Sequence, residues 1–95
     1  MIEYLYSAIR VTAGTNETVA AQVSDAIGNP ITEGCYFVLH LTNNEIAMIK
    51  GNCNEEGIFT FEIPAEVSKN LKGRYWYCIK HYDTEICFKQ PIYFV

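Results

Sequence analysis

The sequence lacks the features that would point to a nucleic-acid or membrane partner. Its seven Lys and Arg residues form no run and its formal net charge is −4, whereas affinity for nucleic acid begins with neutralised phosphates. No apolar run approaches the roughly 18 residues of a membrane helix. Residues 1–7 also lack the basic and apolar regions of a signal peptide. We therefore expect a soluble, unexported protein that binds neither nucleic acid nor membranes.

The usual signatures of catalysis, metal binding and cofactor binding are missing as well. There is no Cys-x-x-Cys pair and no Gly-rich phosphate loop, because the six Gly residues are spread over the chain. His40 and His81 belong to no Cys–His or Ser-His-Asp pattern that a sequence can reveal. Glu55 and Glu56 are typical of a solvated loop. The sequence thus predicts no enzyme, and no catalytic, cofactor-binding or metal-binding residues.

The four cysteines raise the question of disulfides. In the predicted hairpins Cys78 falls opposite Cys87, and Cys35 comes within a residue of facing Cys53. Disulfides are rare in proteins that are not exported, and a free cysteine is a common small residue of a core. We expect all four to be reduced, structural thiols.

What the chain does contain is the composition of one β-rich domain. Its 95 residues suit a single domain over 1–95, and 49% of them are hydrophobic. Seven Tyr, five Phe and one Trp favour strands, because aromatic side chains fill pleated, half-buried surfaces.

Alternation of apolar and polar residues predicts about seven strands and one short helical turn. A period of two belongs to strands, whose side chains point to opposite faces in turn. Phe59, Phe61 and Ile63 alternate in this way, as do Tyr75 and Tyr77. Residues 65–71 have helix formers and are followed by Gly73, which predicts one or two helical turns. The expected strands cover 2–11, 18–24, 35–42, 58–63 and both arms of a last hairpin, with one more strand after Asn43-Asn44.

Two hairpins carry predicted registers. A turn at Asn43-Asn44 puts Leu41 opposite Ile46 and Leu39 opposite Met48. The last hairpin, centred on residues 82–83, is expected to end where Pro91 interrupts the strand, and residues 92–95 extend the edge. Its expected pairs are Ile79 with Ile86, Tyr77 with Phe88, Tyr75 with Gln90, Lys80 with Glu85, Cys78 with Cys87, and Trp76 with Lys89 as a cation–π pair.

Three stretches combine turn and strand patterns, and they carry a resemblance. They are residues 23–31 (VSDAIGNPI), 57–64 (GIFTFEIP) and 71–79 (LKGRYWYCI). The first resembles the start of bacterial and phage immunoglobulin-like domains. The others are similar to the second half of the N-terminal domain of phage baseplate upper proteins and other virion immunoglobulin-like modules. The resemblance covers about residues 16–90, and the antibody Cys…Trp…Cys pattern is absent.

The resemblance implies a fold and a role. The fold is an immunoglobulin-like Greek-key β-sandwich, which turns every 8–12 residues also favour. The role is that of a non-catalytic structural or assembly module of a bacteriophage virion, such as a capsid decoration, head–tail, baseplate or fibre component, assembled in the host cytoplasm. Its partners are then other virion proteins, or further copies of itself in a multicopy assembly. Residues 1–45 hold five acids and one base, which suits a solvated acidic face or head-to-tail contact between copies.

Aromatic residues are the candidate contact residues. Tyr4, Tyr6, Tyr36 and Trp76 could lie at a partner interface, where aromatics are favoured anchors, or could pack within the sandwich. Tyr82 is a further candidate for exposure. Aromatic rings also stack on sugars, so a carbohydrate-binding or adhesive surface module is the alternative function.

Overall fold

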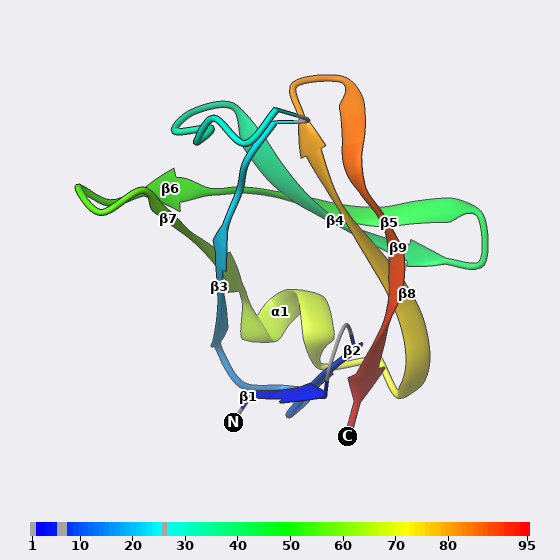
Figure 1. The fold of residues 1–95 in the computed structure, drawn as a ribbon. Helices are drawn as coiled ribbons and strands as arrows, with labels where there is room; N and C mark the ends of the chain where they lie inside the picture. Colours follow the sequence, from blue (N-terminus) through cyan, green and yellow to red (C-terminus); the bar gives the residue numbers. More distant parts are fainter. Residues whose placement is uncertain (1, 6–7, 26) are drawn as a thin grey trace.

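The computed structural model describes the backbone of residues 2–5, 8–25 and 27–95, and the side chains of these residues except 2–5, 87 and 88. The described chain is mostly β-structure, arranged as two sheets that face each other across one core (Figure 1). The all-β sandwich predicted from the alternation is therefore confirmed.

The larger sheet has six strands and supplies one layer of the sandwich. All of its neighbouring strands are antiparallel except β2 and β9, which run parallel. Its order is β1 (Ile2–Leu5), β2 (Ala8–Val11), β9 (Thr84–Phe94), β8 (Gly73–His81), β4 (Cys35–Leu41) and β5 (Asn44–Lys50).

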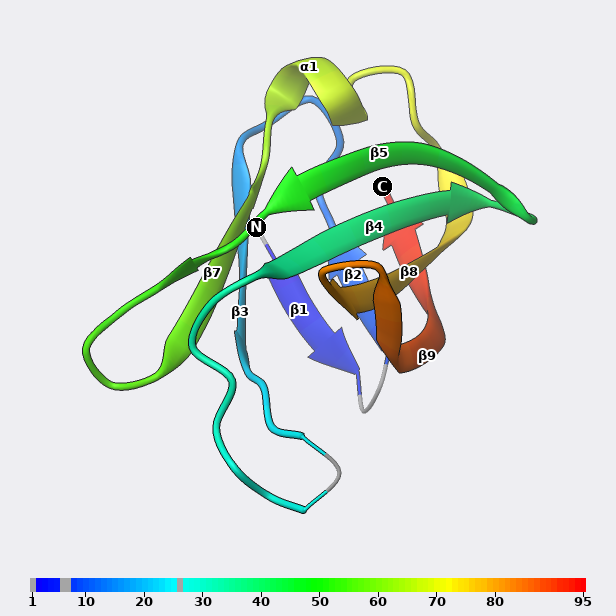
Figure 2. The same ribbon diagram turned by 90° about the horizontal axis from the view of Figure 1, so that it is seen from above.

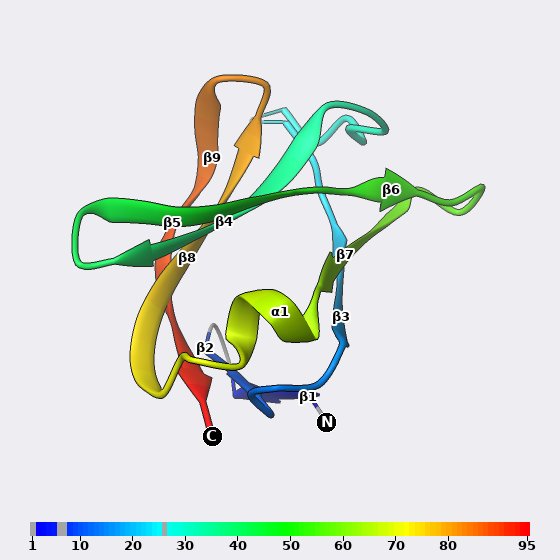
Figure 3. The ribbon, with the colours of Figure 1, turned by 180° about the vertical axis from the view of Figure 1, so that it is seen from behind.

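The smaller sheet supplies the other layer. Its three strands are antiparallel, in the order β3 (Glu17–Gln22), β7 (Ile58–Ile63) and β6 (Asn52–Cys53). The short helix α1 (Ala65–Ser68) follows Pro64 and lies toward one end of the sandwich, between β7 and β8 (Figure 3). This helix is the single helical turn that the sequence predicts.

Aromatic side chains from both sheets meet in the core. Phe37 of the larger sheet stacks on Tyr77 with ring centroids 5.0 Å apart, and its ring lies 5.8 Å from that of Phe61 in the smaller sheet. Phe59, Phe61 and Ile63 are at most 1% exposed, as their alternation predicts. Burial of this apolar surface is the main force that holds the layers together.

The first predicted strand is wrong in one respect. Residues 2–11 do not form one strand, because β1 turns back on β2 with Leu5 opposite Ala8. Ile9 and Val11 of β2 are buried beside β9. A hairpin and a long strand share the same alternation, and no Gly or Pro marks this turn in the sequence. With this division and the short, unpredicted strand β6 (Asn52–Cys53), the described residues form nine strands rather than about seven.

The β4–β5 hairpin turns one residue earlier than predicted. Thr42 adopts a positive φ of 59°, and Leu41 pairs with Asn44 rather than Ile46. An irregularity then adds a residue to β5, so that Leu39 pairs with Ala47 rather than Met48. This bulge turns Ala47 and Ile49 toward the core and leaves Met48 on the opposite face.

The last hairpin has the predicted turn but a different register beyond it. Lys80 pairs with Glu85 as expected, and two irregularities then each add a residue to β9. Cys78 therefore does not face Cys87, and β9 continues through Pro91 to Phe94. The corrected pairs are Ile79 with Cys87, Tyr77 with Gln90, Trp76 with Pro91, and Tyr75 with Ile92.

Candidate interaction face

The side of the larger sheet that faces away from the smaller sheet carries the candidate site. We call it the outer face, and its position follows from alternation: Phe37, Leu39 and Ile79 belong to the core, so their neighbours along the strands point away from it. Its members are Tyr36, Val38 and His40 on β4, Glu45 and Met48 on β5, and Trp76, Cys78 and Lys80 on β8.

A buried strip crosses the middle of the outer face. Val38 and Cys78 are fully buried and His40 is 4% exposed, although Val38 and Cys78 lie outside the main core cluster. His40 Nε2 is 3.4 Å from Cys78 Sγ, within hydrogen-bond distance for sulfur. Beside the strip, Lys80 Nζ donates to Glu45 Oε1 at 2.6 Å, which ties β8 to β5 across β4.

The His40–Cys78 pair has the electrostatics of a structural contact. Burial lowers the pKa of His40 and raises the pKa of Cys78 to about 11. Near neutral pH both groups are uncharged, whereas a nucleophilic cysteine needs a thiolate, which an adjacent His⁺ or Lys⁺ favours. Cys35 likewise has a raised pKa, caused first by burial. The described cysteines Cys35, Cys53 and Cys78 are free thiols.

Acid is expected to destabilise the fold through His40. Burial holds its pKa below the ordinary 6.5, so below that pH the unfolded chain binds a proton here more readily than the folded chain does. The stabilisation by neutral His40 is complete above about pH 6.5 and is lost as the pH falls toward its folded pKa. Urea denaturation at several pH values between 8 and 5 should show the free energy of unfolding falling.

The matched control for this titration is His40→Gln. The surrounding charged groups, Lys89, Glu45, Lys80 and Glu85, all remain in that variant. The difference between the two stability curves therefore isolates His40. Parallel curves between pH 7.5 and 5.5 would contradict the assigned burial of a neutral imidazole.

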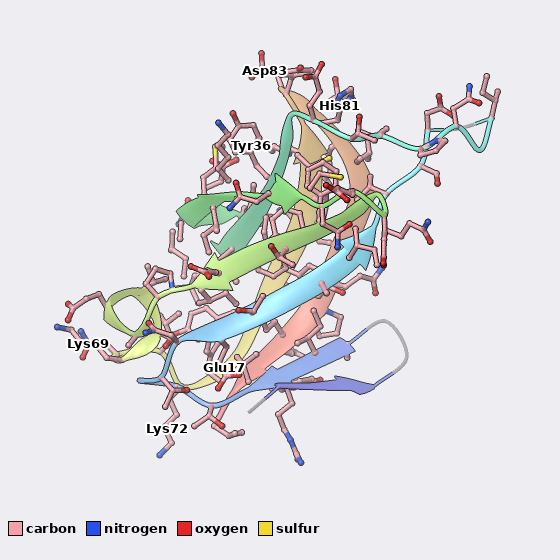
Figure 4. The ribbon with its side chains drawn as sticks, turned by 90° about the vertical axis from the view of Figure 1, so that its left-hand side faces the viewer. Glu17, Tyr36, Lys69, Lys72, His81 and Asp83 are labelled. Atoms are coloured by element: carbon pink, nitrogen blue, oxygen red, sulfur yellow. The ribbon has the colours of Figure 1, made fainter. Side chains whose placement is uncertain are left out.

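Two hollows flank the buried strip. The first has a volume of about 520 Å³ and is lined by Tyr36, Met48, Lys80, Tyr82 and Asp83. It lies toward the end of the molecule where Figure 4 places Tyr36, His81 and Asp83. The second, of about 330 Å³, lies beyond the other end of β4 and is lined by Thr42, Asn43, Trp76 and Lys89.

Each hollow contains one of the predicted contact residues. Tyr36 is opposite Lys80, and Trp76 is opposite His40, in the β4–β8 ladder. The cation over the Trp76 ring is not Lys89 but Arg74, whose guanidinium carbon is 5.2 Å from the ring centroid. This correction follows from the shifted register of β9, which puts Pro91 opposite Trp76.

For the other two predicted contact residues, Tyr4 and Tyr6, the structure describes no side chain. Tyr4 is described only as a backbone position in β1, opposite Ile9 and at the far edge of the larger sheet from β5. Tyr6 lies outside the described residues. Sequence reasoning missed Met48, which is 53% exposed, because the predicted register placed it beside Leu39 in the core. The bulge in β5, which the sequence does not reveal, is what places Met48 opposite Val38 on the outer face.

A third hollow, of about 390 Å³, opens between the sheets beside β3. Its walls include the core residues Val19, Tyr77 and Ile79, and it contains no charged side chain. It is therefore an opening at the edge of the core between the two sheets, and it offers no charged group to orient a polar ligand.

Within the described part of the chain, no group of three or more His, Cys, Asp or Glu residues could hold a metal ion. None of the described helices is long and apolar enough to cross a membrane. Comparison with known proteins finds no matching family, no similar curated protein and no similar solved structure.

Proposed function

We propose that this protein is a non-catalytic module that binds other proteins through the outer face of its larger sheet. The single observation that carries the proposal is the composition of that face. Tyr36 and Trp76 each line a hollow, Met48 on the edge strand β5 is half exposed, and the Lys80–Glu45 pair stands beside them. Aromatic residues and Met with a charged rim are the typical make-up of protein interfaces.

The neutral His40–Cys78 pair supports binding rather than catalysis. It is the one Cys–His hydrogen bond among the described residues, and burial keeps both side chains uncharged near neutral pH. The pair contributes rigidity, because the buried strip of Val38, His40 and Cys78 fixes the backbone beneath both hollows. Rigid anchors lose little entropy on binding, which favours affinity.

The arrangement of strands supports an immunoglobulin-like module. β4, β8 and β9 are neighbours in one sheet while β3 and β7 are neighbours in the other, as strands C, F, G and B, E are in immunoglobulin domains. Together with the resemblance of residues 16–90 to bacterial and phage domains, this favours a structural part of a bacteriophage particle. The partners are then other virion proteins, met during assembly in the host cytoplasm.

Loss of the two outer-face aromatics is expected to reduce incorporation into particles. The test compares the wild type with Tyr36→Ala and Trp76→Ala in particles of the phage that encodes the chain, and counts copies by quantitative mass spectrometry. Each truncation of an interface anchor costs about 1–2 kcal/mol or more, hence at least a fivefold loss of affinity. Ile27→Ser is the control, because Ile27 is 83% exposed and lies in the connection between β3 and β4, outside the outer face.

The experiment has clear contrary outcomes. Particles that lack the protein would contradict the virion assignment. Equal incorporation of all variants would contradict the assignment of binding to the outer face.

The carbohydrate alternative is favoured by the ring of Trp76 beside the polar side chains of Asn43 and Thr42. Trp76 is the only Trp, so its fluorescence reports directly on sugar binding in a titration with oligosaccharides.

A further inference from the structure

The free edge of β5 is a second feature of the larger sheet, and two of its residues, Glu45 and Met48, also belong to the outer face. β5 ends the order of that sheet, and no described strand pairs with its other side. Seen from above, β5 runs side by side with β4, the described strand with which it pairs (Figure 2). Its seven residues, Asn44–Lys50, contain neither Pro nor Gly. Such an edge presents unpaired backbone groups that can accept another strand.

The hydrogen-bond pattern identifies which backbone groups face outward. The N–H of Gly51 donates to the carbonyl oxygen of Cys35 at 2.9 Å, so residues 47 and 49, which share its phase, also face β4. Met48 and Lys50 are in the alternate phase and direct their N–H and C=O groups away from β4. These two residues are therefore able to pair with an added strand.

The side chains of β5 favour a second copy of the same strand as the partner. Ile46 and Met48 are 41% and 53% exposed, and they provide apolar contact area at the centre of the edge. Glu45 and Lys50 stand near opposite ends of the strand, and both are exposed; the Glu45 side chain remains 44% exposed although its Oε1 accepts from Lys80 of the same chain. Antiparallel pairing brings Glu45 of one copy close to Lys50 of the other, whereas parallel pairing in register would bring like charges together.

We propose that two copies of this chain pair antiparallel through β5, with the twofold axis at Met48. In this register Met48 exchanges backbone hydrogen bonds with its own counterpart, and the outward groups of Lys50 meet the segment around Ile46. The two larger sheets then form one continuous sheet across an isologous interface. The inference goes beyond the outer-face function and does not depend on it.

The test is the mass of the full-length protein in solution, measured by light scattering over a range of concentrations. We expect a species of twice the 10.8 kDa chain mass. Glu45→Lys and Lys50→Glu should each weaken the dimer at least tenfold, because each brings like charges together in the homodimer. An equimolar mixture of the two variants should restore it, since the mixed dimer regains opposite charges at both contacts.

Two further variants separate this interface from general effects. Met48→Pro removes an N–H that points outward, so it should abolish the dimer while leaving the β4–β5 ladder in place. Lys72→Glu is the charge-matched control, because Lys72 is exposed at the other end of the molecule from Tyr36 (Figure 4). Circular dichroism checks that every variant is folded.

Three results would overturn the proposal. These are a wild type that stays monomeric at millimolar concentration, a dimer that Lys50→Glu leaves intact, and a mixture of the charge variants that fails to associate. None of them bears on the binding of other proteins by Tyr36 and Trp76, so the two proposals can fail separately.

Discussion

Phe37→Ala is expected to destabilise the fold by about 3–5 kcal/mol, the usual loss for a phenylalanine deleted from a packed core. Phe37 is fully buried on β4 and stacks on Tyr77 at 5.0 Å in its own sheet. Its ring also lies 5.8 Å from Phe61 in the smaller sheet, so the truncation opens a cavity at the contact between the layers. The surrounding rings belong to different strands and cannot collapse into that space without moving the sheets.

The size of this loss makes it easy to measure. A small domain has a total stability of about 5–15 kcal/mol, and each kcal/mol shifts the melting temperature of a chain this long by roughly 4–8 °C. We therefore expect thermal denaturation of Phe37→Ala at least about 12 °C below the wild type. Met48→Ala is the control from the neighbouring strand, because Met48 is 53% exposed and its truncation should cost less than about 1 kcal/mol. Equal losses in both variants would contradict the position of the core.

The core of the sandwich could be predicted from the sequence because it depends only on local alternation. Phe59, Phe61 and Ile63 share one face of β7 whatever the strand pairs with, and the structure buries all three. The same reasoning assigned Tyr77 and Trp76 to opposite faces of β8, and Tyr77 is in the core while Trp76 lines an outer hollow. Alternation along a single strand assigns side chains to its two faces whichever strands lie beside it.

Registers could not be predicted in the same way. Each β-bulge moves every later pair by one residue, and the bulges in β5 and β9 coincide with no Gly or Pro that would mark them. The predicted Cys78–Cys87 and Trp76–Lys89 pairs both depended on an unbroken ladder, and both are wrong for this reason. The Lys80–Glu85 pair is confirmed because it precedes the first irregularity.

The candidate face depends on contacts between distant parts of the chain. His40 meets Cys78 only because β4 lies beside β8, although 38 residues separate them in the sequence. The free edge of β5 is likewise a consequence of sheet order, which the hairpin patterns leave open. Tyr36 and Trp76 could be named as contact candidates from their chemistry, but their common face follows from the β4–β8 pairing.

Gly51→Ala is expected to destabilise the fold by about 1–3 kcal/mol through overpacking. Gly51 lies between β5 and β6, where the chain passes from the larger sheet to the smaller one. A Cβ atom at this position would clash with Cε1 of Phe61 and would lie 2.9 Å from Cδ1 of Phe59. Both rings are almost fully buried, and the N–H of Gly51 is held by the carbonyl oxygen of Cys35, so neither side can move freely.

A double-mutant cycle shows whether the Phe61 ring is the cause. Phe61→Leu removes Cε1, the atom with which the new methyl group would clash, so the cost of Gly51→Ala should be smaller in the Phe61→Leu background than in the wild type. Gly57→Ala is the control for a purely conformational cost, because its Cβ would meet nothing within 4 Å but its φ is +80°. Urea denaturation of the four proteins of the cycle measures the coupling. Additive losses would mean that the Phe61 ring is not the cause of the destabilisation and would point to the Phe59 ring, whose Cδ1 is 2.9 Å from the same Cβ position.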